Sequence, residues 1–171
     1  MVDFSHALSE DRLEQLDLRN AIAVDSHTLA RAAIAMMRRN ELGCAVIVDD
    51  HQRPHGIFTE RSVISMLLRG SCLDQTSVSQ FTDPLFICMD KRQTVKSAWK
   101  TILDTKARFI CVTNDDGSLF GVTGQRGLAT YLAKHCAENP PTEVSRQVNQ
   151  ASPQQLDAGS RSIVAAMVGE H

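Results

Sequence analysis

A short segment with the groups needed to bind an anion spans residues 56–62 and reads Gly-Ile-Phe-Thr-Glu-Arg-Ser. It follows an apolar stretch and precedes another, which predicts a strand that turns directly into a helix. The first N–H groups of a helix lack intrahelical partners and carry partial positive charge, so they suit a phosphate group. Thr59 adds a hydroxyl donor, and Arg61 adds a cation unless it is only a solvated surface side chain.

A second copy of this segment spans residues 121–127 and reads Gly-Val-Thr-Gly-Gln-Arg-Gly. Its three glycines do not have the spacing of a dinucleotide-binding fingerprint, and no strand-helix-strand unit with a downstream acidic residue surrounds them. The backbone amides around Gly124, together with Arg126, could still hold a bare anion.

The histidines and cysteines predict neither a metal site nor a catalytic one. His51 and His55 lie in an expected turn, where two histidines are more typical of a solvated loop than of a metal site. The five cysteines match neither a disulfide framework nor zinc ligands, which favours a reducing cytoplasm. Cys44, Cys88 and Cys111 lie in apolar stretches and are expected to pack as small hydrophobic side chains. No nucleophile can be paired with a base, so the sequence does not predict an enzyme.

An internal repeat positions the two glycine-rich segments. Each copy predicts the order strand, helix, strand, strand, helix. In the first copy the elements are expected at residues 21–24, 28–39, 44–48, up to 58 and 62–68, and in the second at 85–88, from 94, at 109–113, up to 123 and at 127–132. The sequence Asp115-Asp116-Gly117 predicts a hairpin turn between the last two strands.

The helices of the two copies differ in how much apolar surface they carry. After a predicted N-cap at Thr94, one apolar face is indicated by Val95, Ala98, Trp99, Ile102 and Leu103. The helix expected from Thr28 is apolar on all sides, which predicts that it lies wedged between layers. Residues 63–68 are apolar except for Ser65, and burying this surplus against the other repeat or another subunit predicts a homodimer.

Composition and charge exclude several classes of function. The chain has 171 residues, of which 43% are hydrophobic and 22% are charged, as in an ordinary globular protein. Its 18 basic and 20 acidic residues are interspersed and give a net charge of −2, so a nucleic-acid surface is not expected. Neither a membrane-spanning stretch nor a secretion leader is visible, and a cytoplasmic location without membrane partners is expected.

Residues 56–62, which follow an apolar strand and an Asp-Asp turn, resemble the closing motif of a cystathionine-β-synthase-type (CBS) domain, and residues 121–127 resemble it more loosely. The resemblance covers residues 18–135. It implies a mixed α+β fold of tandem CBS repeats, each β-α-β-β-α, with two small mixed sheets packed by pseudo-twofold symmetry, the arrangement called a Bateman module. It also implies disc-like dimers that require no cofactor, bind AMP, ADP, ATP or S-adenosylmethionine between the repeats and regulate another protein.

The sequence departs from the family motif at the residues that would contact a nucleotide. In the family a Thr or Ser faces the phosphate and an Asp accepts from both ribose hydroxyls. Ser62 and Gly127 stand at the two Asp positions, and Gly124 stands at the second Thr or Ser position. A hydrogen bond to a charged acceptor is worth roughly 1.5 to 3 kcal/mol, so ribose recognition would weaken about tenfold or more.

Two functions therefore remain open. One is a stand-alone regulatory module that binds an adenosine-type nucleotide and signals to a separate partner protein. The other is a ligand-free structural or protein-interaction module. The resemblance implies ligand contacts at Ile22, Gly56, Ile57, Thr59, Arg61, Ser62, Gly124 and Arg126.

The segments outside the repeats complete the expected organisation. Residues 1–17 form a lead-in, with a short helix expected over 9–17 and Ser9 as its N-cap. The first CBS domain spans 18–70 and the second 71–136. Residues 137–171 form an arm rich in Pro, Gln and Ser, with a brief helix expected over 163–168.

Overall fold

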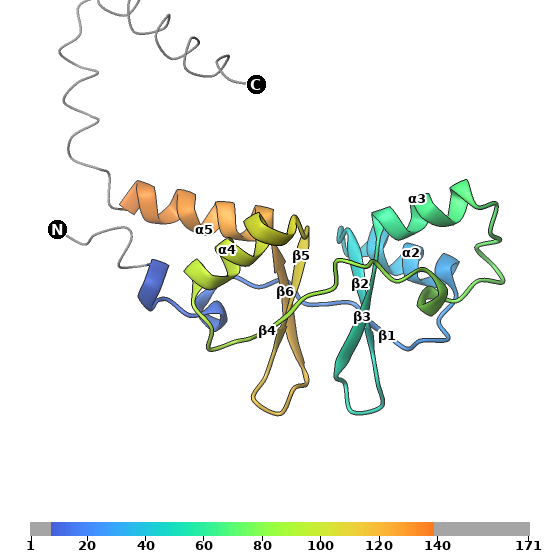
Figure 1. Cartoon of the computed structure of the whole chain (residues 1–171), viewed down its shortest axis with the longest axis horizontal. Helices are drawn as coiled ribbons and strands as arrows, with labels where there is room; N and C mark the ends of the chain where they lie inside the picture. The colour runs from blue at the N-terminus through green and yellow to red at the C-terminus, as the bar shows by residue number, and fades with distance from the viewer. Residues whose placement is uncertain (1–7, 139–171) are drawn as a thin grey trace, which may run out of the picture. The chain divides into compact units, whose positions relative to one another are not determined.

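The computed structural model describes residues 8–138, in which the same order of elements occurs twice (Figure 1). The first repeat consists of β1 (Ala23–Val24), α2 (Ala30–Arg39), β2 (Cys44–Val48), β3 (Pro54–Thr59) and α3 (Glu60–Leu68). The second consists of β4 (Cys88–Asp90), α4 (Val95–Thr105), β5 (Phe109–Thr113), β6 (Leu119–Gly124) and α5 (Gln125–Glu138). The 3₁₀ turn η1 (Leu13–Gln15) precedes the first repeat, and the 3₁₀ turn η2 (Val78–Phe81) lies between the two repeats. The predicted mixed α+β fold is confirmed.

Each repeat forms its own three-stranded mixed sheet. The strand orders are β1-β2-β3 and β4-β5-β6, and in each sheet the first pair is parallel and the second antiparallel. The helix between the two parallel strands supplies the crossover that such a pair needs. The predicted hairpin turn is confirmed, because Gly117 has φ +83° and its N–H donates to the carbonyl of Asn114.

The central strand β2 is buried along its whole length because both of its faces are covered. Successive side chains of a strand point to opposite faces. Ala45 and Ile47 therefore pack into the core that α2 and α3 cover, whereas Cys44, Val46 and Val48 point to the other face. Strand β5 divides in the same way, with Ile110 and Val112 in the helix-covered core of the second repeat.

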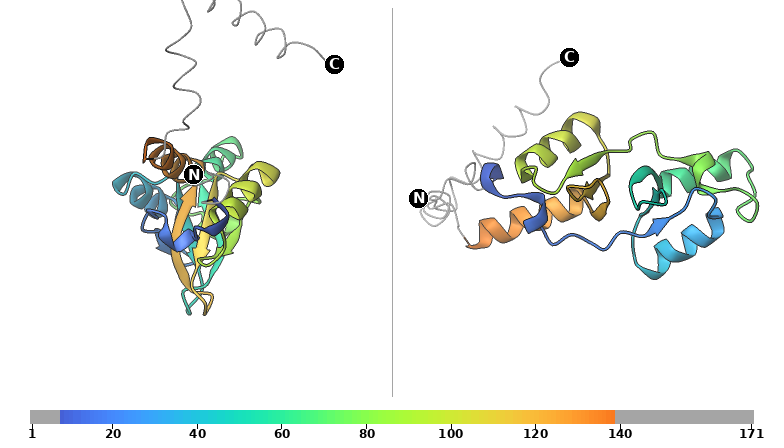
Figure 2. Two further views of the ribbon diagram at one scale, coloured as in Figure 1. Left: turned by 90° about the vertical axis from the view of Figure 1, so that its left-hand side faces the viewer. Right: turned by 90° about the horizontal axis from the view of Figure 1, so that it is seen from below.

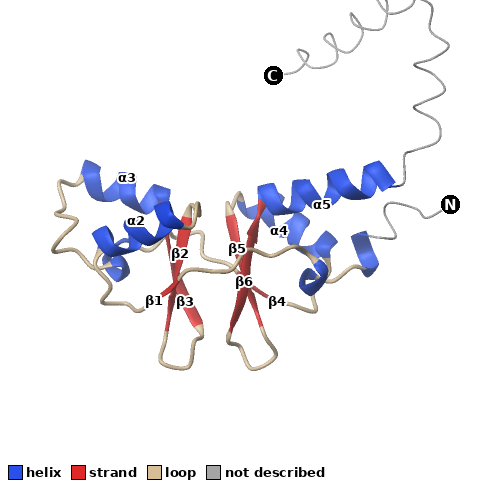
Figure 3. Ribbon diagram, turned by 180° about the vertical axis from the view of Figure 1, so that it is seen from behind, coloured by secondary structure: helices blue, strands red, loops and turns tan. Residues whose placement is uncertain are grey.

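The two sheets pack against each other, and the helices lie on their outer faces (Figures 2 and 3). We call the apolar layer between the sheets the seam. Its buried side chains are Cys44, Val46, Val48, Ile57, Cys111 and Val122. Since seam residues alternate with core residues along β2, β3 and β5, each of these three strands contributes to two apolar layers.

The helix predicted after Thr94 is confirmed as α4. The Thr94 hydroxyl accepts from the Ser97 N–H at 3.1 Å, as an N-cap does, and Val95, Ala98 and Ile102 are buried.

The prediction that the first helix is wedged between layers is wrong. In α2 only Ala30, Ala33 and Met37 are buried, on one face. Of the four remaining apolar residues of α2, Ala32 and Ala35 are small, Ile34 is half-buried and Met36 is 36% exposed, so an apolar composition did not require burial on every side. The helix begins after Leu29 and not at Thr28, whose hydroxyl donates to Asp25.

The N-terminal segment differs from the predicted helix over residues 9–17, because its backbone pairs with the second repeat. The N–H of Leu13 donates to the carbonyl of Gln93, and the N–H of Val95 donates to the carbonyl of Asp11. Residues 8–10 are helical, but the helix does not continue to residue 17: the turn η1 follows it, and Leu13 is fully buried in the core of the second repeat.

Further element boundaries differ from the expected ones, and α3 and α5 each begin two residues earlier than expected. Strand β1 is shorter than residues 21–24, β4 begins at the end of the expected 85–88, and α5 continues beyond 132.

Contacts divide the chain into residues 1–133, which hold both sheets, and residues 134–171, with the boundary inside α5. Within residues 8–138, none of the helices combines the length and hydropathy that a bilayer crossing requires. The predicted helix over 163–168, the arm from residue 139 and the side chain of Cys136 lie outside the described residues.

Candidate functional site

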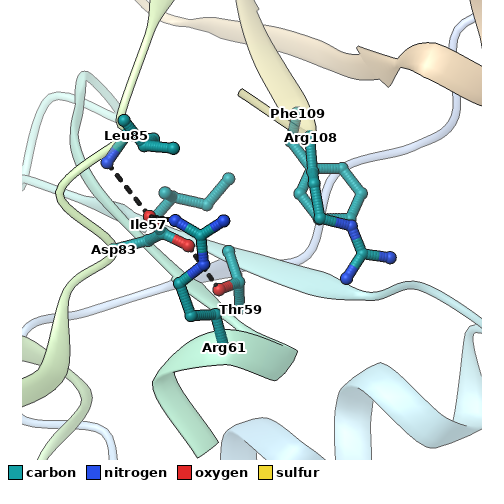
Figure 4. Close-up of a pocket in the computed structure, with 7 residues that line it drawn as sticks. All are labelled: Ile57, Thr59, Arg61, Asp83, Leu85, Arg108 and Phe109. Atoms are coloured by element: carbon teal, nitrogen blue, oxygen red, sulfur yellow. Dashed lines mark hydrogen bonds and ion pairs between the residues drawn. The ribbon is translucent and has the colours of Figure 1, made fainter. Parts of the chain in front are cut away.

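A pocket opens beside Thr59, where β3 turns into α3, and residues from both repeats and from the connection between them line it (Figure 4). We call it the Thr59 pocket. It offers about 220 Å³ of unoccupied space, part of which is open solvent. The lining residues are Ile57, Thr59, Arg61, Asp83, Leu85, Arg108 and Phe109.

The strand-to-helix turn is closed by a reciprocal cap. The Thr59 hydroxyl accepts from the Ser62 N–H at 3.4 Å, and the Ser62 hydroxyl accepts from the Thr59 N–H at 3.1 Å. This capping box satisfies two backbone donors at the turn. Ser62 is 3% exposed and faces the backbone, so its hydroxyl does not line the pocket.

A carboxylate from the connection between the repeats enters the same pocket. The N–H of Asp83 donates to the Ile57 carbonyl at 2.7 Å, which joins the connection to β3. One carboxylate oxygen of Asp83 accepts the Thr59 hydroxyl proton at 2.7 Å, and the other accepts the Leu85 N–H at 3.0 Å. Arg61 Nη1 lies 3.7 Å from Asp83 Oδ1. The single hydroxyl proton of Thr59 is thus given to Asp83 in this structure.

The second repeat supplies the opposite wall of the pocket. The guanidinium of Arg108 lies 5.6 Å from the Phe109 ring centroid and donates to Glu60 of α3 at 3.0 Å. Both groups of this ion pair are 56% exposed, so its contribution to stability is small. The pocket therefore combines apolar walls with two arginines and one buried carboxylate.

The structure brings three of the eight sequence-predicted site residues to this pocket, namely Ile57, Thr59 and Arg61. Ile22 is buried in the core of the first repeat, and its carbonyl accepts from the Val46 N–H. Gly56 lies farther back on β3, where a Cβ atom would meet Thr82 at 3.1 Å.

The second motif has a different environment, which we call the Gly124 site. A Cβ atom at Gly124 would lie 2.3 Å from the backbone oxygen of Arg108, so no larger residue fits without a backbone shift. The Arg19 N–H donates to the Val122 carbonyl, as the Asp83 N–H does to Ile57, and the Arg19 guanidinium donates to the carbonyl of Glu41. Arg126 is exposed at the start of α5.

The cysteines divide into buried and exposed ones. Cys44 and Cys111 are buried as predicted, whereas Cys88 is exposed, because it lies on the edge strand β4 beside Cys111. Burial raises the pKa of the Cys44 thiol to about 12, with the charge of Glu60 adding to the effect. His51 and His55 are exposed, and no group of metal-ligating side chains occurs among the described residues.

Sequence reasoning did not find four of the lining residues, which are Asp83, Leu85, Arg108 and Phe109. Phe109 begins strand β5 of the other repeat and Arg108 immediately precedes it, and only the packing of the two sheets brings them to Thr59. Asp83 lies 24 positions after Thr59 in a stretch without periodicity. The only local signal is the sequence Asp83-Pro84, which is typical of a turn.

Comparison of the sequence with protein families matches residues 13–69 to the family model described as the CBS domain. An uncharacterised protein of Methanopyrus kandleri is 29% identical over 106 residues, which cover 61% of this chain and 54% of that protein. The chain thus spans about half the length of this curated relative.

Solved structures share the fold over both repeats. The CBS domain protein PAE2072 from Pyrobaculum aerophilum, complexed with AMP, superposes with a TM-score of 0.64 at 21% identity and covers 72% of this chain and 99% of its own. The CBS domain pair of protein MJ0100, in complex with 5′-methylthioadenosine and S-adenosyl-L-methionine, gives a TM-score of 0.65 at 13% identity and covers 73% of this chain and 98% of its own.

Proposed function

We propose that this chain, which is a CBS domain pair, is a regulatory module that binds an adenosine-type nucleotide in the Thr59 pocket and signals to a separate partner protein. The observation that carries the proposal is the composition of the pocket, because Arg61 comes from one repeat and Arg108 from the other. A ligand held by both contacts two structural units at once. The complexes of the similar domain pairs with AMP or S-adenosyl-L-methionine support the choice of ligand class.

The chemistry of the lining suits the parts of such a nucleotide. Ile57, Leu85 and the Phe109 ring give apolar surface for a base, and the two guanidinium groups give donors for a phosphate. Arg61 is 49% and Arg108 is 56% exposed, so both side chains can rotate. Rotation is needed, because the pocket as it stands has a cavity volume of only about 10 Å³, which is room for a single water molecule.

We further propose that one nucleotide binds per chain. At the Gly124 site the Arg108 carbonyl occupies the space that a Thr side chain would need, and Gly127 offers no side chain. The apolar residues exposed on α3, Ile64, Leu67 and Leu68, support a homodimer. A cytoplasmic, non-enzymatic role beside a separate regulated protein completes the proposal.

The alternative is a ligand-free interaction module. It is favoured by Ser62, which is buried in the capping box and is not a ligand-facing acid. In this case the Asp83 contacts to Thr59 and Leu85 only brace the connection between the repeats.

Titration calorimetry of the full chain separates the two functions. AMP, ADP, ATP and S-adenosylmethionine are each added at up to millimolar concentration, and we expect saturable heat with at least one of them. Arg61→Ala should weaken AMP binding about tenfold, because it removes a charge-assisted hydrogen bond. Arg39→Ala, at the exposed end of α2, is the matched control and should leave binding unchanged. Absence of heat with all four ligands selects the interaction module.

A further inference from the structure

We infer that Asp83 accepts the two ribose hydroxyls of the bound nucleoside and so supplies, from the connection between the repeats, the carboxylate that the sequence motif lacks at position 62. This inference rests on the proposed function, since it assigns a recognition role within the Thr59 pocket. It starts from position and burial. Asp83 is 9% exposed and lines the pocket, and its backbone is fixed to β3 through the Ile57 carbonyl (Figure 4).

The carboxylate of Asp83 has acceptor capacity to spare. An ionised carboxylate offers about four lone-pair sites on its two oxygens. The Thr59 hydroxyl occupies one site on Oδ2, and the Leu85 N–H occupies one on Oδ1. Arg61 lies at 3.7 Å, beyond hydrogen-bond length, and acts there as a nearby charge. One site remains on each oxygen, which matches the two donors of a vicinal diol.

The charges around Asp83 favour a neutral donor at this point of the pocket. A phosphate would be repelled by the carboxylate, and Thr59 has no second proton to offer it, since its only one goes to Asp83. An ammonium group would compete with Arg61, which already balances the charge of Asp83. Hydroxyl groups meet neither obstacle, so the sugar is expected at Asp83 and the phosphate at the exposed guanidinium groups.

The corresponding position of the other repeat lacks such an acid. Arg19 makes the backbone contact to Val122 that Asp83 makes to Ile57, and its guanidinium is held by the Glu41 carbonyl. The pocket that contains a buried carboxylate is therefore the one with Thr59. Ribose recognition is assigned to this pocket alone.

The role of Asp83 is tested by comparing how two ligands bind to two proteins. Affinities for adenosine and 2′,3′-dideoxyadenosine are measured by calorimetry on the full chain and on Asp83→Asn. In the unmodified chain, removal of both hydroxyls should weaken binding about tenfold or more. In Asp83→Asn the two ligands should differ by no more than about twofold, because the charged acceptor is gone. Asp74→Asn is the matched control, since Asp74 also pairs with an arginine but is exposed and does not line the pocket.

The outcomes distinguish failure of the proposed function from failure of the role assigned to Asp83. If the unmodified chain binds neither adenosine nor AMP, the proposed function fails and this inference with it. If it binds adenosine and Asp83→Asn keeps the full penalty for the dideoxy ligand, the inference alone is overturned.

A measurement on the unmodified chain covers the case in which Asp83→Asn does not fold. With ¹³C-labelled aspartate, adenosine should shift the Asp83 carboxyl resonance, and dideoxyadenosine at equal occupancy should not. Equal shifts with both ligands would overturn the inference.

Discussion

Cys88 and Cys111 are direct neighbours on the parallel strands β4 and β5, and their different surroundings give the two thiols opposite properties. A hydrogen bond from Cys111 lowers the pKa of Cys88, against the opposing effect of partial burial. The same bond and burial raise the pKa of Cys111. Since the thiolate is the nucleophile, Cys88 has the more reactive sulfur of the pair.

Alkylation by iodoacetamide checks this difference. Followed by peptide mass spectrometry against pH, the rate at Cys88 should rise at a lower pH in the unmodified chain than in Cys111→Ala, which lacks the donor. Cys111→Ser keeps a donor and should retain the low midpoint. Cys44, with its pKa raised to about 12, should stay unmodified at pH 8 while the protein is folded. Identical midpoints for Cys88 in all three proteins would contradict the prediction.

The candidate site shows which residues a sequence can and cannot reveal. Thr59 and Arg61 were predictable because the strand-turn-helix pattern and its polar residues lie together in the chain. Asp83 and Arg108 were not, because they reach the pocket through the connection and through the packing of the two sheets. Ser62 does not line the pocket for a local reason, since the capping box directs its hydroxyl to the backbone of Thr59.

At the level of single elements, the spacing of apolar residues predicted which side chains are buried, whereas their number alone did not. The apolar spacing in α4 predicted its buried face, and an alternation of two apolar layers explains why β2 and β5 read as continuous apolar runs. The number of apolar residues in α2 predicted too much burial, because Ala32, Ala35 and Met36 are exposed while only one face of the helix is buried. The predicted helix of the lead-in is interrupted where its backbone bonds to the second repeat, as at Asp11.

Helix α3 keeps the apolar surplus that its sequence suggested. Ile64 is 57%, Leu67 60% and Leu68 83% exposed, although the opposite face is anchored by the fully buried Met66. A second copy of the same face can cover these side chains in a twofold dimer.

Sedimentation velocity tests this dimer with a pair of matched variants. The unmodified chain should sediment at micromolar concentration as a species of twice the chain mass. Leu67→Asp should sediment as a monomer, because a charge would be buried without a partner. Leu103→Asp makes the same change at a leucine of α4 that is 62% exposed, and it should remain a dimer. A monomeric unmodified chain, or dissociation by both variants alike, would argue against an interface through α3.

On the scale of the whole molecule, the seam makes the two repeats depend on each other. Val46 of the first repeat is fully buried against a layer that includes Cys111 and Val122 of the second. The turn of the first hairpin also contacts the second, since the N–H of Leu119 donates to the carbonyl of Gln52. The repeat in the sequence predicted two similar units, and the alternation of apolar residues on β2 and β5 shows why neither unit buries its apolar surface alone.

Val46→Ala tests whether this shared layer makes unfolding a single event. The change removes two buried methyl groups and should lower the free energy of unfolding by about 2 kcal/mol, which corresponds to a Tm decrease of roughly 4 to 8 °C in a chain of this size. The single tryptophan, Trp99, lies on α4 of the second repeat and reports that repeat by fluorescence. If the repeats unfold together, the fluorescence midpoint falls by the same amount as the midpoint of far-ultraviolet circular dichroism, although the substitution is in the first repeat.

Leu103→Ala, on the exposed face of α4, is the control and should move neither midpoint by more than about 2 °C, as expected for a surface substitution worth at most about 0.5 kcal/mol. A fluorescence midpoint that stays in place while the dichroism splits into two transitions would show that the repeats unfold independently.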